Sequence, residues 1–511
     1  MSETGEKPLR NKHLILWVLI IGYILIFSFL TIRCYNTYNT RSIDLAIYDQ
    51  VTWGVLQGQP QTTIGNKPTF LTFHLNLILF PLALFYWLWS DVRVLLILQS
   101  IGIGLGGLAV FHLAEGKIKY KYAGLCCALI YFLYFPLEEV NLFDFHPVSL
   151  VIPFLLFGFL FLERRRYKWA FVFMALAISC RETTALVVAM TGIYYIVKSK
   201  KDNQVEKSRL LIIGLMLCGL GLIYFAIVFL YIKPFWQIGS LTNVLPQAGS
   251  FADSGQSNQV RFFSMISAYI KSVFSWDRLM YIYYLLMPLM FISLFSLRIF
   301  FISLPILGLN LLGGYQYLRA LDTHYSSEII PFVIISAVYG VPCFVSLIKK
   351  RAEQISCIKN SKIIAGENLT GLVLIIMICS SLTTNYFYGY SILSRGFNAQ
   401  RYRPTQKSVR FSYAVSLIPD DASVSSCILA MPHLSQRKIL DYFPCPQAKN
   451  MDYILVDFNE PRGLGVSLQE HQCYLEQLRS YISGLISGKT HEAVFYKGSI
   501  ILIRRIKDIK K

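Results

Sequence analysis

The chain has 511 residues, of which 55% are hydrophobic and only 15% are charged, and its mean hydropathy is +0.50. Repeated apolar runs of about 18 residues or more have the length of a membrane-crossing helix, which excludes a soluble globular protein and predicts a multi-pass membrane protein. The net charge of +19 does not indicate nucleic-acid binding, because Lys and Arg concentrate in short loops between apolar runs, where they orient helices.

Basic residues fall in five clusters that predict the orientation of the chain: Lys7, Arg10 and Lys12; Lys117, Lys119 and Lys121; Arg164, Arg165, Arg166 and Lys168; Lys198, Lys200, Lys201, Lys207 and Arg209; and Lys349, Lys350 and Arg351. By the positive-inside rule, all five lie in the cytoplasm. An even number of crossings must therefore separate any two of them. The run 70–89 carries polar residues and a central Pro, so we expect it to lie along the outer surface without crossing.

The parity of the basic loops predicts about eleven spans, with the N-terminus in the cytoplasm and everything after residue 395 outside. The expected spans are 14–31, 92–114, 122–136, 148–162, 169–180, 183–197, 210–232, 279–297, 299–314, 329–348 and 370–388. Residues 33–91 form the first outer loop and residues 137–147 the second. The polar stretch 233–277 is a further outer loop.

The first outer loop contains an expected amphipathic helix over 41–60, in which Ile43, Ile47, Val51 and Val55 repeat every four residues. We expect this helix to lie on the membrane. Its two acids, Asp44 and Asp49, are on different faces, so only one of them easily points at a given site. Asp44 is a candidate functional acid; alternatively, it complements the helix dipole from the first turn.

The second outer loop has the sequence NLFDFHP, with Asp144 and His146 between two apolar runs. An ionisable pair beside a membrane is a functional candidate, since its desolvation is costly. An extended Asp-x-His would point both side chains the same way and could hold a phosphate, a hydroxyl or a divalent metal. The alternative is loop chemistry ahead of a helix that begins at Pro147.

Five further ionisable residues are expected at the outer side. Arg181 and Glu182 occupy the turn between 169–180 and 183–197 and are predicted to lie at the floor of a water-filled cavity; the alternative is a mutually neutralising pair in a helix turn. His74, Arg319 and His324 are in outer segments, where each one alone is also compatible with an ordinary surface position.

The last hundred residues have a different character. Short apolar runs at 424–426, 453–457, 491–496 and 499–505 predict strands, and residues 467–486 have apolar positions at helical spacing. This indicates a small soluble α/β domain. The basic, polar stretch 394–407 marks the boundary, which gives a membrane domain over 1–393 and an extracytoplasmic domain over 394–511.

Several motifs resemble those of a bacterial and archaeal family of predicted membrane proteins of unknown function. They are IDLAIYDQ with WGVLQGQP, FHLN, NLFDFHP, the RET after a span, THYSSEIIPF and IPDDASVSSCILAMPHLSQR. The resemblance covers nearly the whole chain. That family in turn resembles, in topology and in the placement of acids, the GT-C superfamily of polyprenyl-phosphate-dependent glycosyltransferases, such as protein O-mannosyltransferases and the lipid A aminoarabinose transferase.

The GT-C resemblance implies roles for individual residues. Asp44 matches the acid of the first outer loop and would be the general base that deprotonates an acceptor, while Asp144 matches the second-loop acid and would orient the acceptor or a metal. Arg181, with Arg319 or His324, would bind the departing phosphate, since guanidinium pairs bidentately with phosphate oxygens. Arg181 departs from the family pattern, which has Lys at the first position of the RET motif; the charge is kept, and the geometry differs.

The resemblance thus implies an enzyme, an inverting GT-C-type glycosyltransferase in a bacterial or archaeal cell membrane. It would move a sugar from a polyprenyl-phosphate-linked donor to a glycan, lipid or protein acceptor on the outer face. His146, His74, Asp49 and Glu182 are the remaining candidate substrate contacts. No cofactor is required by this chemistry, although Asp144 with His146 leaves a divalent metal open. The alternatives are a transporter or flippase of a lipid-linked or anionic substrate, and a non-enzymatic envelope assembly protein.

Overall fold

The computed structural model describes residues 6–65, 74–200, 204–235, 275–354, 367–460 and 468–506. The start of the run 70–89 and most of the outer loop expected over 233–277 lie outside these residues. The chain divides into two compact units. Unit 1 comprises residues 1–28, 73–78 and 97–397, and unit 2 comprises residues 29–72, 79–96 and 398–511. The predicted domains were 1–393 and 394–511, so the first-loop residues were assigned to the membrane domain, whereas unit 2 contains them. The predicted domain division stays a prediction.

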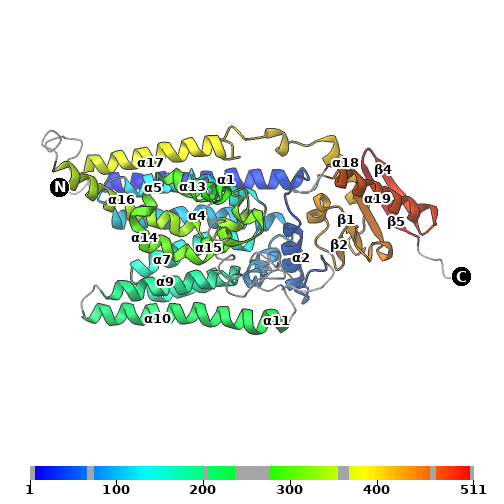
Figure 1. Ribbon diagram of the computed structural model, residues 1–511. Coiled ribbons are helices and arrows are strands. Elements are labelled where there is room, and N and C mark those ends of the chain that lie inside the picture. The colour runs from blue at the N-terminus through cyan, green and yellow to red at the C-terminus, as the bar shows by residue number, and fades with distance from the viewer. Residues whose placement is uncertain are drawn as a thin grey trace, which may run out of the picture. The chain divides into compact units, whose positions relative to one another are not determined.

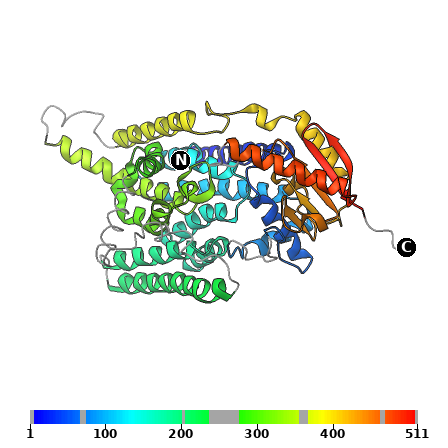
Figure 2. The same ribbon diagram turned by 45° about the vertical axis from the view of Figure 1, so that its right-hand side comes forward.

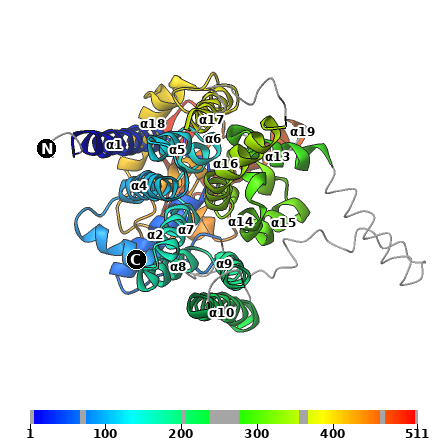
Figure 3. The same cartoon turned by 90° about the vertical axis from the view of Figure 1, so that its left-hand side faces the viewer.

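Unit 1 is a bundle of helices that run side by side (Figure 1) and are seen close to end-on in Figure 3. Its longer helices are α1 (Glu6–Asn36), α4 (Arg93–Lys117), α5 (Ala123–Phe132), α6 (Phe135–Leu142), α7 (Val151–Glu163), α8 (Tyr167–Cys180), α9 (Thr184–Ser199), α10 (Gln204–Ile227), α13 (Trp276–Leu286), α15 (Leu304–Leu312), α16 (Ile330–Ala352) and α17 (Glu367–Tyr388). The predicted α-helical membrane architecture is confirmed.

Six helical segments within the described residues are long and apolar enough to cross a membrane, or seven if the bent pair α5–α6 is one span. Three more apolar helical segments are shorter, at Pro147–Glu163, Tyr167–Cys180 and Thr184–Ser199. Each of the eleven expected spans falls on a helical segment. The described part of 70–89 forms only α3 (Leu79–Ala83) and the 3-10 helix Leu84–Trp87, which are too short to cross.

The expected pair 279–297 and 299–314 is divided at a different place from the one predicted. The chain turns at Met290 and Phe291, whose φ angles of 51° and 56° are left-handed. A single apolar segment then runs from Ile292 to Leu312. The sequence does not mark this turn, because neither residue is Gly, Asn or Asp, the types that commonly adopt such a conformation.

The predicted basic clusters are linked to one another by ion pairs at one end of the unit 1 helices. Glu163 lies 2.5 Å from Lys198 and 3.6 Å from Lys117. Lys12 lies 3.9 Å from Glu115, and Arg165 lies 3.2 Å from Glu206. Four of the five clusters are therefore joined. Their proximity agrees with the expectation that the basic clusters share one side of the membrane. Their location in the cytoplasm stays a prediction.

Unit 2 is built around a five-stranded sheet with the order β2-β1-β3-β5-β4. Its strands are β1 (Val424–Ser426), β2 (Leu440–Tyr442), β3 (Tyr453–Asp457), β4 (His491–Lys497) and β5 (Ile500–Arg505). The first three are parallel, with Val424 paired to both Leu440 and Tyr453, and β5 is antiparallel to β3 and β4. Four of these strands were predicted; β2, which has only three residues, was missed.

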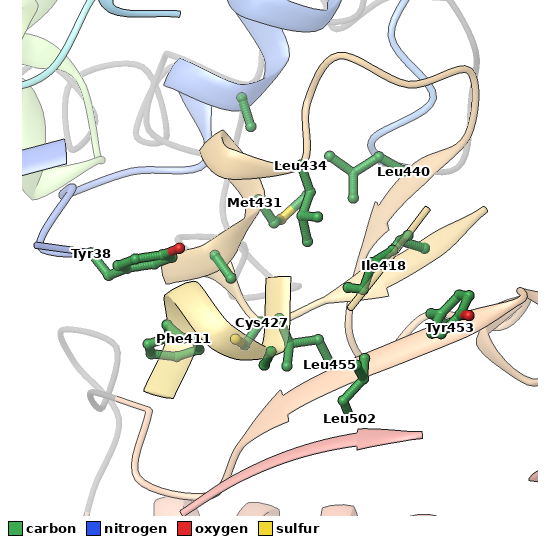
Figure 4. Packing of buried hydrophobic residues seen from close by; sticks show 14 of the residues in the cluster. Tyr38, Phe411, Ile418, Cys427, Met431, Leu434, Leu440, Tyr453, Leu455 and Leu502 are labelled. Atoms are coloured by element: carbon green, nitrogen blue, oxygen red, sulfur yellow. The ribbon is translucent and has the colours of Figure 1, made fainter. Parts of the chain in front are cut away.

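A helix packs on each face of this sheet. Every residue of β3 is buried, and because successive strand residues point to opposite faces, both faces must be covered. Leu455 and Leu502 pack with Phe411 of α18 (Gln406–Ser416) in one core (Figure 4). Their neighbours Ile454 and Ile501 pack in a second core against α19 (Leu468–Ser487), which lies across the other face (Figure 2). The helix predicted over 467–486 is therefore confirmed, while α18 was not predicted.

The first outer loop shares the core of this domain. Its helix α2 (Asp44–Leu56) contributes Ala46 and Ile47 to the cluster that contains Phe411, and Tyr38 stacks on the Phe411 ring at a centroid distance of 5.1 Å. The predicted helix thus exists, but its apolar residues face protein where a membrane-facing stripe was expected. Because they share a core, the first loop and the C-terminal domain lie on the same side of the membrane.

Candidate functional site

The candidate residues are divided between the two units. Asp44 and Asp49 belong to unit 2. The others belong to unit 1, namely His74, Asp144, His146, Arg181, Glu182, Arg319 and His324. Most of the second group gathers where α8 and α10 end and where α9 and α16 begin. This is the end of those helices opposite to the basic clusters.

Glu182 is the centre of a buried charge network. Its Oε1 lies 2.9 Å from Nδ1 of His74 and 2.6 Å from Nζ of Lys233, and the backbone N–H of Leu75 donates to its Oε2 at 3.1 Å. Burial alone would raise the pKa of Glu182, but His74 and Lys233 outweigh it and hold the pKa well below its usual range. Glu182 is therefore an anion whose charge is compensated by its neighbours.

Lys233 reaches this network from a segment of unusual geometry. The last turn of α10 passes into a π-helix at Val228–Ile232, directly before Lys233. Such insertions are rare and frequently lie at functional sites, because they re-aim the residues that follow.

Arg181 lies beside a second buried acid, Glu328. The closest approach between guanidinium and carboxylate is 4.0 Å, which is longer than a hydrogen bond, and the guanidinium also lies 5.6 Å from the ring centre of Tyr325. Glu328 instead accepts hydrogen bonds from Thr183 at 3.0 Å and Thr184 at 2.8 Å. Burial raises the pKa of Glu328, although Arg181 and the two threonines act in the opposite direction.

The Arg181 side chain is only 12% exposed, and its Nε is buried without a hydrogen-bond partner among the described residues. Buried guanidinium N–H groups are ordinarily satisfied by an acceptor. This end of the bundle thus presents unused donors from a fixed positive charge.

Asp144 and His146 are held by Gln99, a polar residue near the start of the apolar helix α4. Its Nε2 donates to the backbone oxygen of Asp144 at 2.9 Å, and its Oε1 accepts the backbone N–H of His146 at 2.9 Å. The expected extended Asp-x-His is wrong: Asp144 has φ 71°, the left-handed region, which Asp tolerates better than most residues. His146 is extended before Pro147, as predicted.

The imidazole of His146 stacks on that of His324, with ring centroids 3.9 Å apart and an interplanar angle of 20°. Phe143 lies 5.3 Å from His146 and 5.6 Å from His324. Burial, together with the proximity of His146, Arg181 and His74, holds the pKa of His324 well below its usual range. His324 is thus neutral, and its buried Nδ1 has no hydrogen-bond partner among the described residues.

Arg319 is not part of this cluster of side chains. Its Nε lies 2.8 Å from Oδ2 of Asp277, and its NH1 donates to the backbone oxygen of Gly313 at 2.8 Å. Its charge is therefore already compensated by protein groups.

In unit 2, Asp44 is the first residue of α2 and accepts a hydrogen bond from Ser42, whose Oγ also accepts the backbone N–H of Asp44 at 2.9 Å. Asp44 is half-buried. This position fits both the helix-dipole interpretation and a catalytic one.

Asp49 is fully buried and accepts hydrogen bonds from Tyr86 and, at 2.5 Å, from Ser435 of the C-terminal domain. Burial raises its pKa to about 6, although these hydrogen bonds act to lower it. Its contacts tie the first loop to the sheet domain.

Three residues of the unit 1 cluster were missed by sequence reasoning: Gln99, Lys233 and Glu328. Each stands in or beside an apolar helix, and an intramembrane polar residue is itself a signal of function. No group of three or more His, Cys, Asp or Glu side chains able to hold a metal ion occurs in the described ranges.

The sequence profile of a family described as "Predicted membrane protein (DUF2079)" matches residues 35–481. The chain belongs to this family. The DUF2079 match confirms the family resemblance that the motifs indicate, and it makes the chain a multi-pass membrane protein.

Among solved structures, this DUF2079 protein is similar to the crystal structure of ArnT from Cupriavidus metallidurans in the apo state, with 10% identity, a TM-score of 0.48, and coverage of 95% of this chain and 98% of that chain. No curated protein sequence matches it.

Proposed function

We propose that this DUF2079 protein is a membrane glycosyltransferase that transfers a sugar from a polyprenyl-phosphate-linked donor to an acceptor on the outer face of the membrane. The observation that carries the proposal is the buried Arg181 guanidinium. Its Nε has no hydrogen-bond partner among the described residues, and the neighbouring acid, Glu328, is already hydrogen-bonded by two threonines. A phosphate oxygen is the acceptor that such a group binds best, because the hydrogen bonds are charge-assisted and bidentate.

The neighbours of Arg181 fit the departure of a phosphate. His324 and His146 are stacked imidazoles within the same cluster, and Glu182 is already paired with His74 and Lys233. The acids that could repel a phosphate are thus compensated or hydrogen-bonded. When charge develops on the phosphate, preorganised donors in a buried site stabilise it more strongly than water does.

The transfer itself needs one base. The acceptor oxygen or nitrogen attacks the anomeric carbon, the bond from that carbon to the phosphate oxygen breaks, and the polyprenyl phosphate leaves with the electron pair. Asp44 takes the acceptor proton, as the GT-C resemblance implies, and Asp144 orients the acceptor. Attack opposite to the leaving group inverts the configuration at the anomeric carbon.

Arg181→Gln in the purified full-length protein tests the phosphate contact, with undecaprenyl phosphate as the probe. We expect binding to weaken by about tenfold or more, since hydrogen bonds to a charged partner contribute roughly 1.5–3 kcal/mol. The matched control is Arg395→Gln, which removes an exposed arginine of the same unit. Equal binding by the wild type and Arg181→Gln would contradict the assignment.

Asp44→Asn separates transfer from transport. A transferase with this change keeps binding undecaprenyl phosphate, while the surface glycan or glycolipid made by the native host disappears at unchanged protein level. A transporter or flippase would bind the same anion without breaking its glycosyl bond. Movement of a fluorescent polyprenyl phosphate across proteoliposomes by both wild type and Asp44→Asn, with an unaltered glycan profile, would favour that second class.

A further inference from the structure

A cavity of about 850 Å³ lies in the C-terminal domain, apart from the residues considered so far. It opens where β3 ends and β5 begins, and its wall includes Phe458, Asn459 and Ile500. Both helices of the domain contribute: α18 supplies Lys407 and Arg410, and α19 supplies Arg479 with Ile482 and Ile486 on the apolar side.

The position of the cavity in the sheet is one that commonly binds ligands. β1, β2 and β3 are parallel, and the cavity lies just beyond the carboxyl end of β3. In open sheets of this kind, ligands bind outside the carboxyl ends of the strands, where the backbone diverges and loops provide the contacts.

One of the basic residues that line the cavity, Lys407, is already paired with an acid. Asp457 is fully buried and is satisfied by Lys407 at 2.6 Å, by the Ser499 hydroxyl at 2.6 Å and by the backbone N–H of Asn459 at 3.0 Å. This removes Lys407 from consideration as a free cation.

Arg410 and Arg479, in contrast, have no acidic partner among the described residues. Arg479 lies 5.6 Å from the ring centre of Phe458, and Arg410 packs so closely on Gly498 that a Cβ there would meet its guanidinium at 2.2 Å. Gly498 has φ 67°. The β4–β5 turn therefore leaves room for the Arg410 guanidinium, whose Nε is buried without a hydrogen-bond partner in the described part of the chain.

We propose that this cavity binds an anionic sugar, in which a phosphate or a carboxylate pairs with Arg410 and Arg479 and the sugar body contacts Phe458 and the apolar wall. The proposal concerns a binding property of the C-terminal domain and does not depend on the transferase activity proposed above. Arg410 and Arg479 come from two different helices and line the same cavity, and guanidinium groups form strong, charge-assisted hydrogen bonds with phosphate and carboxylate oxygens.

The test is equilibrium binding to the full-length protein in detergent, with three probes of similar size. Glucose 1-phosphate and glucuronate carry the two anionic groups, and glucose is the neutral analogue. We expect one or both anions to bind and glucose to bind at least tenfold more weakly, and the two anionic arms identify which group is preferred. Equal binding of all three probes, or binding of none, would overturn the proposal.

Variants locate the binding. Arg410→Gln and Arg479→Gln each weaken binding of the preferred anion by about tenfold, while the melting temperature of the protein shows that the domain is still folded. Arg505→Gln, at the opposite end of β5, and Arg395→Gln, at an exposed arginine of unit 1, leave it unchanged. Anion binding that survives the double Arg410→Gln and Arg479→Gln variant but is lost in Arg181→Gln would place it in unit 1 and overturn the assignment.

Discussion

The ammonium group of Lys233 lies 2.6 Å from the carboxylate of Glu182, and this ion pair fixes the end of α10 against the turn between α8 and α9. The two side chains are 11% and 1% exposed. Water therefore does little to screen the pair, and each charge depends on the other for compensation.

Lys233→Met should destabilise the protein strongly, because it leaves the buried Glu182 carboxylate without its ammonium partner. Removing one partner of a buried pair typically costs about 3–5 kcal/mol. The measurement is the melting temperature in detergent, with Lys200→Met, at an exposed lysine, as the matched control. The double variant Glu182→Gln with Lys233→Met should be less destabilised than the sum of the singles. Strictly additive effects would mean that the pair is not coupled.

Gln99→Leu should release the second outer loop. The substitution leaves the Asp144 carbonyl and the His146 N–H without their amide partner, and each buried unsatisfied group costs about 1–3 kcal/mol. We expect faster hydrogen exchange in peptides that cover residues 141–148, and loss of glycan transfer with undecaprenyl phosphate still bound. Exchange in α9 is the internal reference. Unchanged protection of the loop would show that Gln99 does not hold it.

The helices and strands that have a local sequence pattern could be predicted from the sequence. Short apolar runs identified β3 and β5, because a strand that is buried on both faces has apolar residues at successive positions. Helical spacing of apolar residues identified α19, because only one face of that helix is covered. The strand β2 was missed although β1, which is equally short, was predicted. Its pairing depends on β1, which lies some distance back along the chain.

The sequence indicated which ionisable residues belong to the candidate site, but it did not indicate which residues contact them. Arg181, Glu182, His146 and His324 do gather, as their common position beside apolar runs indicates. The partners Gln99, Lys233 and Glu328 come from distant segments, and one sequence does not reveal such pairings. Asp49 illustrates the converse: its link to Ser435, 386 residues away, is visible only in the folded chain.

The buried Asp49 is expected to make the stability of unit 2 decrease as the pH rises. Burial raises its pKa to about 6, from an ordinary value of 3.8, so the folded state binds the proton more tightly than the unfolded state. This contribution is fully present below the unfolded value and is lost as the pH rises through 6; a shift of this size corresponds to roughly 3 kcal/mol. Protection factors from hydrogen exchange in residues 44–56 should therefore fall between pH 4 and pH 7.

The matched variant is Asp49→Asn, which retains one of the two acceptor oxygens that Tyr86 and Ser435 use and does not titrate. Its protection factors in the same peptides should be flat over this range. A slope identical to that of the wild type would assign the pH dependence to another group, with the nearby Asp91 as the first alternative.

His324 predicts the opposite pH dependence in unit 1. Its pKa is held well below the ordinary value of 6.5 by burial and by His146, Arg181 and His74. The unfolded chain therefore binds a proton that the folded chain does not, and stability present above pH 6.5 is lost as the pH falls below it. His324→Phe keeps a ring for the stack and cannot be protonated. Between pH 7.5 and pH 5.5, the melting temperature of the wild type should fall further than that of this variant. Equal decreases would exclude His324 as the source of the pH dependence.

The orientation of the chain can be tested with its natural cysteines. Cys473 is exposed on α19 in the C-terminal domain, which the parity of the basic clusters places outside the cell. Two other exposed cysteines, Cys343 and Cys379, lie within the apolar helices α16 and α17, where an aqueous reagent has poor access. A membrane-impermeant maleimide applied to spheroplasts should therefore label the protein at Cys473, and Cys473→Ser should remove this label.

Cys357 supplies the opposite control, because it follows the basic cluster at Lys349, Lys350 and Arg351, which the positive-inside rule assigns to the cytoplasm. In the Cys473→Ser background it should react only after the membrane is permeabilised. Since the first outer loop shares a core with the C-terminal domain, labelling of Cys473 from outside would also place Asp44 at the outer face, where a lipid-linked donor and its acceptor are expected to meet. The reverse pattern, with Cys357 labelled in intact spheroplasts and Cys473 protected, would invert the topology and remove the outer-face transferase from consideration.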